Sequence, residues 1–135
     1  MVFEFAVSGV PRTAGALSVG KWQSSIRAAA DAVWPYLQPA IETDISITIV
    51  YFHFGDTSID VDNMSKPILD ALKPTYIRDD RFVAQLVARR TRLAPGLILT
   101  SPGTVLLGAI DAAKEKGTDF VYIKISDPPD HGQIP

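Results

Sequence analysis

Aspartates in the middle of the chain are the residues best suited to chemistry. Asp60 and Asp62 are two residues apart, and the pair Asp79 and Asp80 follows them. If the stretch around Asp60 is extended, the side chains of Asp60 and Asp62 project from one face, because strand side chains alternate. Adjacent carboxylates repel one another, so ionising them together in a cleft requires a cation or a shared proton. Carboxylate oxygens are ligands that Mg²⁺ prefers, and the pattern therefore predicts a metal site.

A solvated turn and a calcium-binding loop are two alternatives to a magnesium site for this stretch. An isolated Asp-x-Asp-Asn is commonly a solvated turn with a capping side chain. An EF-hand calcium loop is excluded, because the sixth position counted from Asp60 is Ser65 instead of Gly and the twelfth is Ala71 instead of Glu. The second acidic pair downstream favours the metal site over the turn.

The order of residues in this region resembles a known nuclease family. Asp-x-Asp-Asn-x-x-x-Lys is followed by Asp-Ala-Leu at 70–72, and then by Asp79-Asp80 and Val83. This order is similar to the core motif of RusA-type Holliday junction resolvases, which are crossover-junction endodeoxyribonucleases. The similar segment covers about residues 59–83. By position, the resemblance implies that the functional residues are Asp60, Asp62, Asp80 and Lys66.

The resemblance also implies a mechanism and partners. Asp60, Asp62 and Asp80 would bind Mg²⁺, for which Mn²⁺ can substitute, and the metal would activate water and polarise the phosphate. Lys66 would stabilise the charge that builds on the scissile phosphate. Members of the family act as homodimers on four-way DNA junctions. Two alternatives remain open: a metal-dependent phosphoesterase acting on another phosphate ester, and an inactive nucleic-acid-binding accessory protein.

Several neighbours of these residues are expected to support the site. Lys66 lies four residues before Asp70, so an ion pair on one helix face is an alternative role for it. Asp70 is expected to be structural and to orient Lys66. Asn63 is expected to cap a helix and brace the site, and Asp79 to support Asp80. A histidine base is not required, and His53 is expected to be a core or edge residue.

Length and composition fit a small globular enzyme. With 135 residues, 47% of them hydrophobic and 21% charged, the chain predicts one domain over 1–126 and a loose tail over 127–135. The absence of cysteine excludes disulfides and thiolate metal sites. No signal peptide is recognisable, and proline and glycine interrupt the uncharged run 93–110. A soluble cytoplasmic protein is expected, with 93–110 as a dimer contact or lid.

The charge balance bears on the expected DNA partner. A net charge of −2 and a pI near 5.6 are unusual for a nucleic-acid-binding protein. Residues 81–92, however, carry basic charges alone, directly after the candidate acids. Phosphate contacts supply most of the affinity that does not depend on base sequence. The residues expected to make such contacts are Arg12, Lys21, Arg78, Arg81, Arg89, Arg90 and Arg92.

Hydrophobic periodicity predicts the elements that carry these residues. Alternating apolar residues indicate strands, and apolar residues at three- and four-residue spacing indicate helices. The strands are expected at 2–8, 44–54, 81–92 and 120–125, and the helices at 21–33, 64–72 and 103–116. Strand 44–54 is apolar on both faces towards its end, which predicts a central strand. In strand 81–92, Val83 and Val87 are expected on one face and Leu86 and Ala88 on the other. The fold class expected is α+β, a mixed sheet with helices packed against it.

Overall fold

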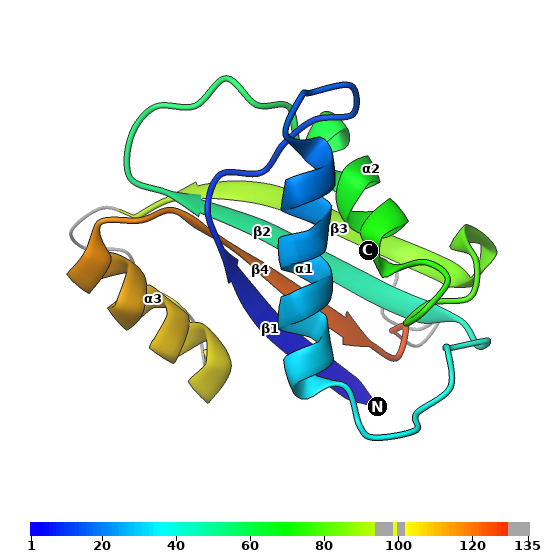
Figure 1. Cartoon of the computed structure of the whole chain (residues 1–135). Coiled ribbons are helices and arrows are strands. Elements are labelled where there is room, and N and C mark those ends of the chain that lie inside the picture. The colour runs from blue at the N-terminus through cyan, green and yellow to red at the C-terminus, as the bar shows by residue number, and fades with distance from the viewer. Residues whose placement is uncertain (94–98, 100–101, 130–135) are drawn as a thin grey trace.

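The computed structural model describes residues 1–93, 99 and 102–129. Within these residues a mixed sheet of four strands carries three α-helices (Figure 1). The strands are β1 (Val2–Ser8), β2 (Ile45–His53), β3 (Val83–Arg92) and β4 (Phe120–Ser126), and the helices are α1 (Val19–Val33), α2 (Val61–Leu72) and α3 (Thr104–Lys116), with a short 3₁₀ turn η1 (Asp80–Phe82). The predicted α+β class, with its single mixed sheet, is confirmed.

The sheet order is β1-β4-β2-β3, so β1 and β3 are the edges. β4 runs antiparallel to both of its neighbours, and β2 runs parallel to β3. A parallel pair requires a crossover, and the connection from β2 to β3 supplies it through α2 and η1. This crossover carries all five of the aspartates considered above, and three of them, Asp62, Asp70 and Asp80, lie beside Leu86 and Ala88 of the β3 edge.

Alternation along β2 builds two cores, one on each face of the sheet. Ile45, Ile47 and Ile49 are fully buried beneath α1 and α2, while Val50 and Phe52 pack towards α3 on the opposite face. The helices accordingly lie on both sides of the sheet, α1 and α2 in front and α3 behind (Figure 1). The predicted central position of β2 is confirmed, because a strand that is apolar on both faces must be covered on both.

Helix α2 begins earlier than the sequence pattern predicted, at Val61 instead of Met64. Asp60 is its N-cap residue, with extended backbone, so the expectation that Asn63 caps the helix is wrong. Asp62 lies in the first turn, where a carboxylate interacts favourably with the helix dipole. Pro67 therefore lies inside the helix, and its carbonyl accepts a hydrogen bond of 3.0 Å from Gln23 of α1.

The prediction that Val83 and Val87 share one face of β3 is wrong. The register shifts between Ile45 and Ser46 of β2, where Ile45 faces Val83 and Ser46 faces Gln85. The extra residue on β3 reverses the alternation, as β-bulges do. Val83 and Ala88 consequently both contact the core under α2, whereas Val87 lies on the α3 face.

Two further expectations concern the C-terminal third of the chain. In the segment 93–110, residues 94–98, 100 and 101 lie outside the described residues, and Ile110 of α3 is buried in the core on its side of the sheet. The expected tail 127–135 is described only to residue 129. In the part of the chain that the structure describes, no helix is both long and apolar enough to span a membrane.

Candidate active site

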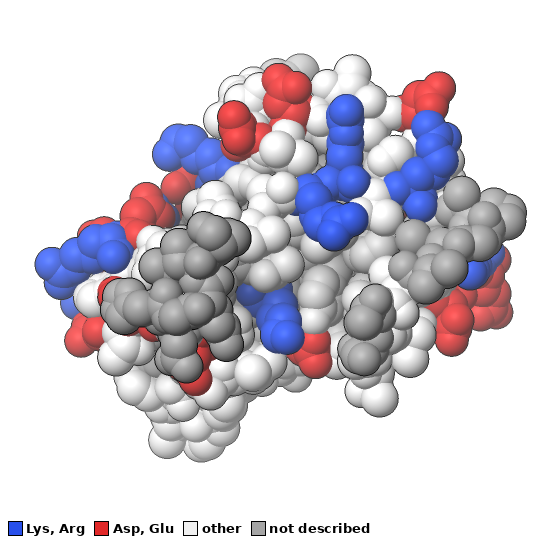
Figure 2. Space-filling model, turned by 180° about the vertical axis from the view of Figure 1, so that it is seen from behind, with Lys and Arg blue, Asp and Glu red and all other residues white. Residues whose placement is uncertain are grey.

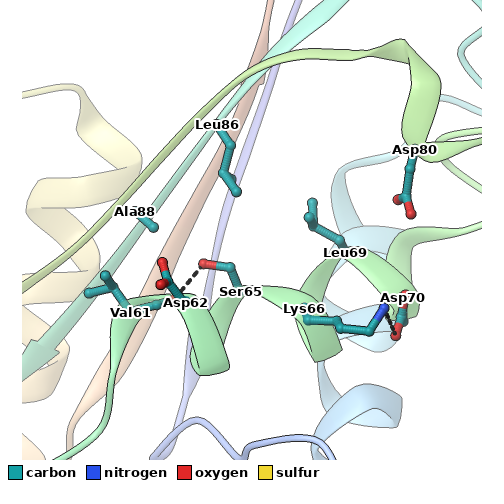
Figure 3. A pocket seen from close by; sticks show the side chains of 9 residues that line it. All are labelled: Val61, Asp62, Ser65, Lys66, Leu69, Asp70, Asp80, Leu86 and Ala88. Atoms are coloured by element: carbon teal, nitrogen blue, oxygen red, sulfur yellow. Dashed lines mark hydrogen bonds and ion pairs between the residues drawn. The ribbon is translucent and has the colours of Figure 1, made fainter.

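A pocket between α2, η1 and β3 gathers most of the predicted functional residues. Figure 3 shows it from close by, with α2 along one side and Asp80 entering from η1. Asp62 and Asp80 lie towards opposite ends of the pocket in this view, and Leu86 and Leu69 lie between them. The lining residues are Val61, Asp62, Ser65, Lys66, Leu69, Asp70, Asp80, Leu86 and Ala88.

The helical repeat explains why α2 presents so many of these side chains together. Ser65 and Lys66 follow Asp62 by three and four residues, which places both on the same helix face as Asp62. Ser65 is buried and donates a hydrogen bond of 2.8 Å to the Val61 carbonyl, so its hydroxyl is engaged within the helix. Opposite them, Leu86 and Ala88 of β3 contribute an apolar wall. The α2 side of the pocket therefore carries charged side chains of both signs, and the β3 side is apolar.

Asp60 does not line this pocket. It is an exposed N-cap residue, and Asp62 follows it within the helix, so the stretch is not extended as the same-face argument required. Two residues of α-helix correspond to a rotation of about 200° around the axis. Asp60 stands before the first helical turn and Asp62 within it, so their side chains do not share a face as in a strand, and only Asp62 lines the pocket.

Asp80 is held by a lysine that the sequence interpretation overlooked. The Nζ of Lys73 lies 2.8 Å from Asp80 Oδ2 and 3.3 Å from Asp70 Oδ1. The hydrogen bond to Asp80 raises the pKa of Lys73 above its ordinary value, and burial opposes this shift. Lys73 follows Asp70 by three residues, so the helix spacing was a signal for the first of these contacts. The contact with Asp80 depends on the return of the chain through η1.

The supporting residues have roles that differ in part from those expected. Asp79 caps η1 by accepting a hydrogen bond of 3.0 Å from the backbone N–H of Arg81, so it orders the turn that carries Asp80. Lys66 lies 3.7 Å from Asp70, the i,i+4 pair anticipated from the sequence. Asn63 is an exposed residue of the first turn of α2. His53 is buried, as expected, and its Nδ1 contacts the Gly55 carbonyl.

The donor set partly fits a divalent metal. Among the described residues, no three His, Asp or Glu side chains lie close enough together to hold one ion. Mg²⁺, however, is usually bound by one or two carboxylates and completes its shell with water and substrate phosphates. Asp62 and Asp80 both line the pocket, but towards its opposite ends, so either can supply one carboxylate and a two-carboxylate site requires them to move together. A three-carboxylate site would additionally require the side chain of Asp60.

The basic residues expected to contact DNA fall into several environments. Arg90 and Arg92 donate hydrogen bonds to backbone carbonyls of the connection between β2 and α2. Arg78 lies 3.9 Å from Glu42, and Arg81 lies over the Phe82 ring at 4.8 Å. Arg89 is exposed on the α3 face of β3, opposite the pocket. Arg12 and Lys21 line a separate hollow beside the start of α1.

Comparison with known families decides the affiliation of the chain. The sequence model of the family described as endodeoxyribonuclease RusA matches residues 17–100, well over half of the chain. The chain belongs to the RusA family. The match contains α1, α2, η1 and β3, and with them every residue lining the pocket. RusA-family membership places the chain among enzymes that cut within DNA strands. No curated protein matches the chain.

Proposed function

We propose that this RusA-family chain is a Mg²⁺-dependent endonuclease that resolves four-way DNA junctions as a homodimer. The observation that carries the proposal is the placement of Asp62 and Asp80 in one pocket with Lys66. These residues come from α2 and η1, and only the crossover between β2 and β3 brings them together. Their agreement with the functional residues implied by the family resemblance supports a hydrolytic site.

Each side chain has a role that follows from its chemistry. Asp62 and Asp80 would hold the metal, with Asp60 as a third ligand if its side chain turns towards them. When bound, the metal supplies a polarised phosphate and a water of lowered pKa. The amine of Lys66 is exposed at the pocket, where it can approach a phosphate and stabilise the negative charge of the transition state.

Basic side chains gather on the side of the sheet opposite the pocket despite the acidic balance of the chain. Figure 2 shows the α3 side of the sheet, opposite the pocket; on its described part, Lys and Arg side chains lie across the middle, and most Asp and Glu side chains lie nearer the outline. A surface of this kind attracts phosphates locally even when the net charge is −2. The pocket itself lies at a sheet edge, where a DNA backbone can reach it.

A two-fold dimer is the simplest way to cut a four-way junction in two symmetric places. The β3 edge offers exposed apolar side chains for such an interface, with Leu86 and Val87 accessible to 43% and 38%. Edge strands also have unpaired backbone groups that can bond to a second copy. The pocket lies next to this edge, so an interface there would bring two pockets near one another.

A cleavage assay tests the proposal. Wild-type protein is incubated with a labelled four-way junction and with a linear duplex of the same sequence, each with and without Mg²⁺. We expect cleavage of the junction alone, dependent on Mg²⁺ and abolished by Asp62→Asn. Asp111→Asn on the exposed surface of α3 is the matched control and should keep full activity.

The other outcomes identify the alternatives. Equal cleavage of duplex and junction would indicate a phosphoesterase of broader substrate range. Junction binding without cleavage, at any concentration of Mg²⁺ or Mn²⁺, would indicate an accessory protein. Either result would overturn the proposed function.

A further inference from the structure

The side chain of Arg90, on β3, contacts the backbone of the connection that leads into Asp60. Its Nη1 donates hydrogen bonds to the carbonyl oxygens of Thr57 at 3.3 Å and Ile59 at 2.9 Å. Ile59 directly precedes Asp60, so one guanidinium nitrogen joins the edge strand to the peptide that enters the N-cap of α2. Arg90 is paired with Tyr51 in the β2–β3 register, which places it on the face of the sheet that carries α2.

The backbone of Asp60 is thereby held on both sides. The carbonyl before it accepts from Arg90, and its own carbonyl accepts a hydrogen bond of 3.0 Å from the N–H of Met64. These two bonds set the direction in which α2 starts. Since Asp62 lies in the first turn of this helix, its position in the pocket depends on the same start.

The beginning of the connection is held by hydrogen bonds of its own, which do not involve Arg90. Asp119 accepts hydrogen bonds from the Phe54 N–H at 3.0 Å and the Tyr51 hydroxyl at 2.6 Å. Arg92 donates to the Phe54 carbonyl at 3.2 Å and pairs with Asp56. Near the end, the hydrogen bond of 3.3 Å from the Ile59 N–H to the Thr57 hydroxyl lies within the connection itself. Arg90 donates the hydrogen bonds from β3 to the carbonyls at this end, where Ile59 also packs against the core under α2.

We infer that Arg90 is a positioning residue for the acidic site, and that it acts on catalysis through the backbone at Thr57 and Ile59 instead of through DNA phosphate. The inference rests on the proposed function, because it assigns Arg90 to the same site. It also revises the expectation that every arginine of β3 contacts DNA. The hydrogen bonds of Arg90 are exposed and contribute little to global stability, so the fold should tolerate its replacement.

The kinetic test uses Arg90→Met in the full chain, with Arg27→Met on α1 as a control that loses the same charge. We expect kcat on the junction to fall by about 10- to 100-fold, since a displacement of about 1 Å can cost about 100-fold. The Kd for the junction and its salt dependence should stay as in the wild type. A phosphate contact would instead weaken binding and reduce the slope of log K against log salt by about 0.9. That result, or an unchanged kcat, would overturn the inference.

Amide hydrogen exchange supplies a readout that does not need activity. The Met64 N–H bonds to the Asp60 carbonyl, and the Leu107 N–H makes the equivalent first-turn bond of 3.0 Å to the Gly103 carbonyl in α3. In Arg90→Met we expect exchange at Met64 to accelerate about tenfold while Leu107 is unchanged. Unchanged exchange at Met64 would overturn the inference. If the wild type cuts no DNA but Met64 responds, the proposed function fails and the positioning by Arg90 stands.

Discussion

The amine of Lys73 lies 2.8 Å from a carboxylate oxygen of Asp80 and 3.3 Å from one of Asp70. A metal ion that binds Asp80 must therefore compete with a lysine for the same carboxylate. The ion pair is partly exposed, with Asp80 accessible to 58%, so its contribution to stability is small. Its importance lies in the electrostatics of the pocket.

Replacement of Lys73 should strengthen metal binding. In Lys73→Met, Asp80 loses the competing cation, and we expect Mn²⁺ to bind several-fold more tightly, since removing a nearby like charge is worth on the order of 1 kcal/mol. Isothermal titration with Mn²⁺ measures the change. Lys114→Met on α3 removes a charge from the other side of the sheet and should leave the affinity as in the wild type. Weaker binding in Lys73→Met would show that Lys73 orients Asp80 for the metal.

Replacement of Lys66 should affect turnover far more than binding. The pair between Lys66 and Asp70 is exposed and is worth about 0.3–0.5 kcal/mol, so Lys66→Ala should fold normally. If its amine acts on the transition state, kcat should fall by orders of magnitude and the Kd for the junction should change by a few fold at most. Single-turnover cleavage and a gel-shift titration provide the two values. Parallel losses in both would make Lys66 a phosphate contact, and unchanged turnover would leave only the ion pair.

Wild-type protein should have a mass of about twice 14.7 kDa in solution. Val87 is an exposed apolar residue of the β3 edge, so Val87→Asp places a charge in the proposed interface. We expect this variant to be monomeric and to lose paired cutting of the junction. Leu17→Asp, at a fully exposed position before α1, should remain dimeric. Light scattering that gives one chain for a wild type that still makes paired cuts would contradict the dimer.

Ionisation of Tyr76 should lower the free energy of unfolding at alkaline pH. Burial and the hydrogen bond to Asp31 raise the pKa of Tyr76 to about 12. Because this value exceeds that of an unfolded tyrosine, about 10, the stabilisation is complete below pH 10 and is lost as pH rises towards 12. Urea unfolding of Tyr76→Phe should show a shallower decline of the unfolding free energy over this interval. A decline as steep as that of the wild type would contradict the assignment.

The sequence predicted the elements well where one periodicity dominates. β1 has the predicted bounds, and α1 buries Trp22, Ile26 and Ala30 as the helical spacing requires. The start of α2 was misplaced because Asp60, Asp62 and Asn63 are all good N-cap residues, and the choice among them depends on contacts outside the motif. One such contact is the bond from Arg90 to the Ile59 carbonyl.

The candidate site was predictable in its membership more than in its geometry. The resemblance to the RusA family implied Asp62, Lys66 and Asp80, which do share a pocket, and also Asp60, which does not line it. Order and spacing could not show that Asp60 lies outside that pocket. Side chains two residues apart share a face in a strand but not in a helix, and the motif does not say which of the two it forms. Nor could they show the partner of Asp80, since Lys73 meets it through a return of the chain that local patterns do not encode.

The position of a bound Mn²⁺ ion tests the central claim most directly. Anomalous diffraction from crystals soaked in Mn²⁺ locates the ion independently of any assay of activity. The account predicts a peak about 2 Å from carboxylate oxygens of both Asp62 and Asp80, which metal binding must draw together from opposite ends of the pocket, with Lys73 displaced from Asp80. A protein that cuts junctions with Mn²⁺ but binds the ion elsewhere, leaving Lys73 on Asp80, would contradict it.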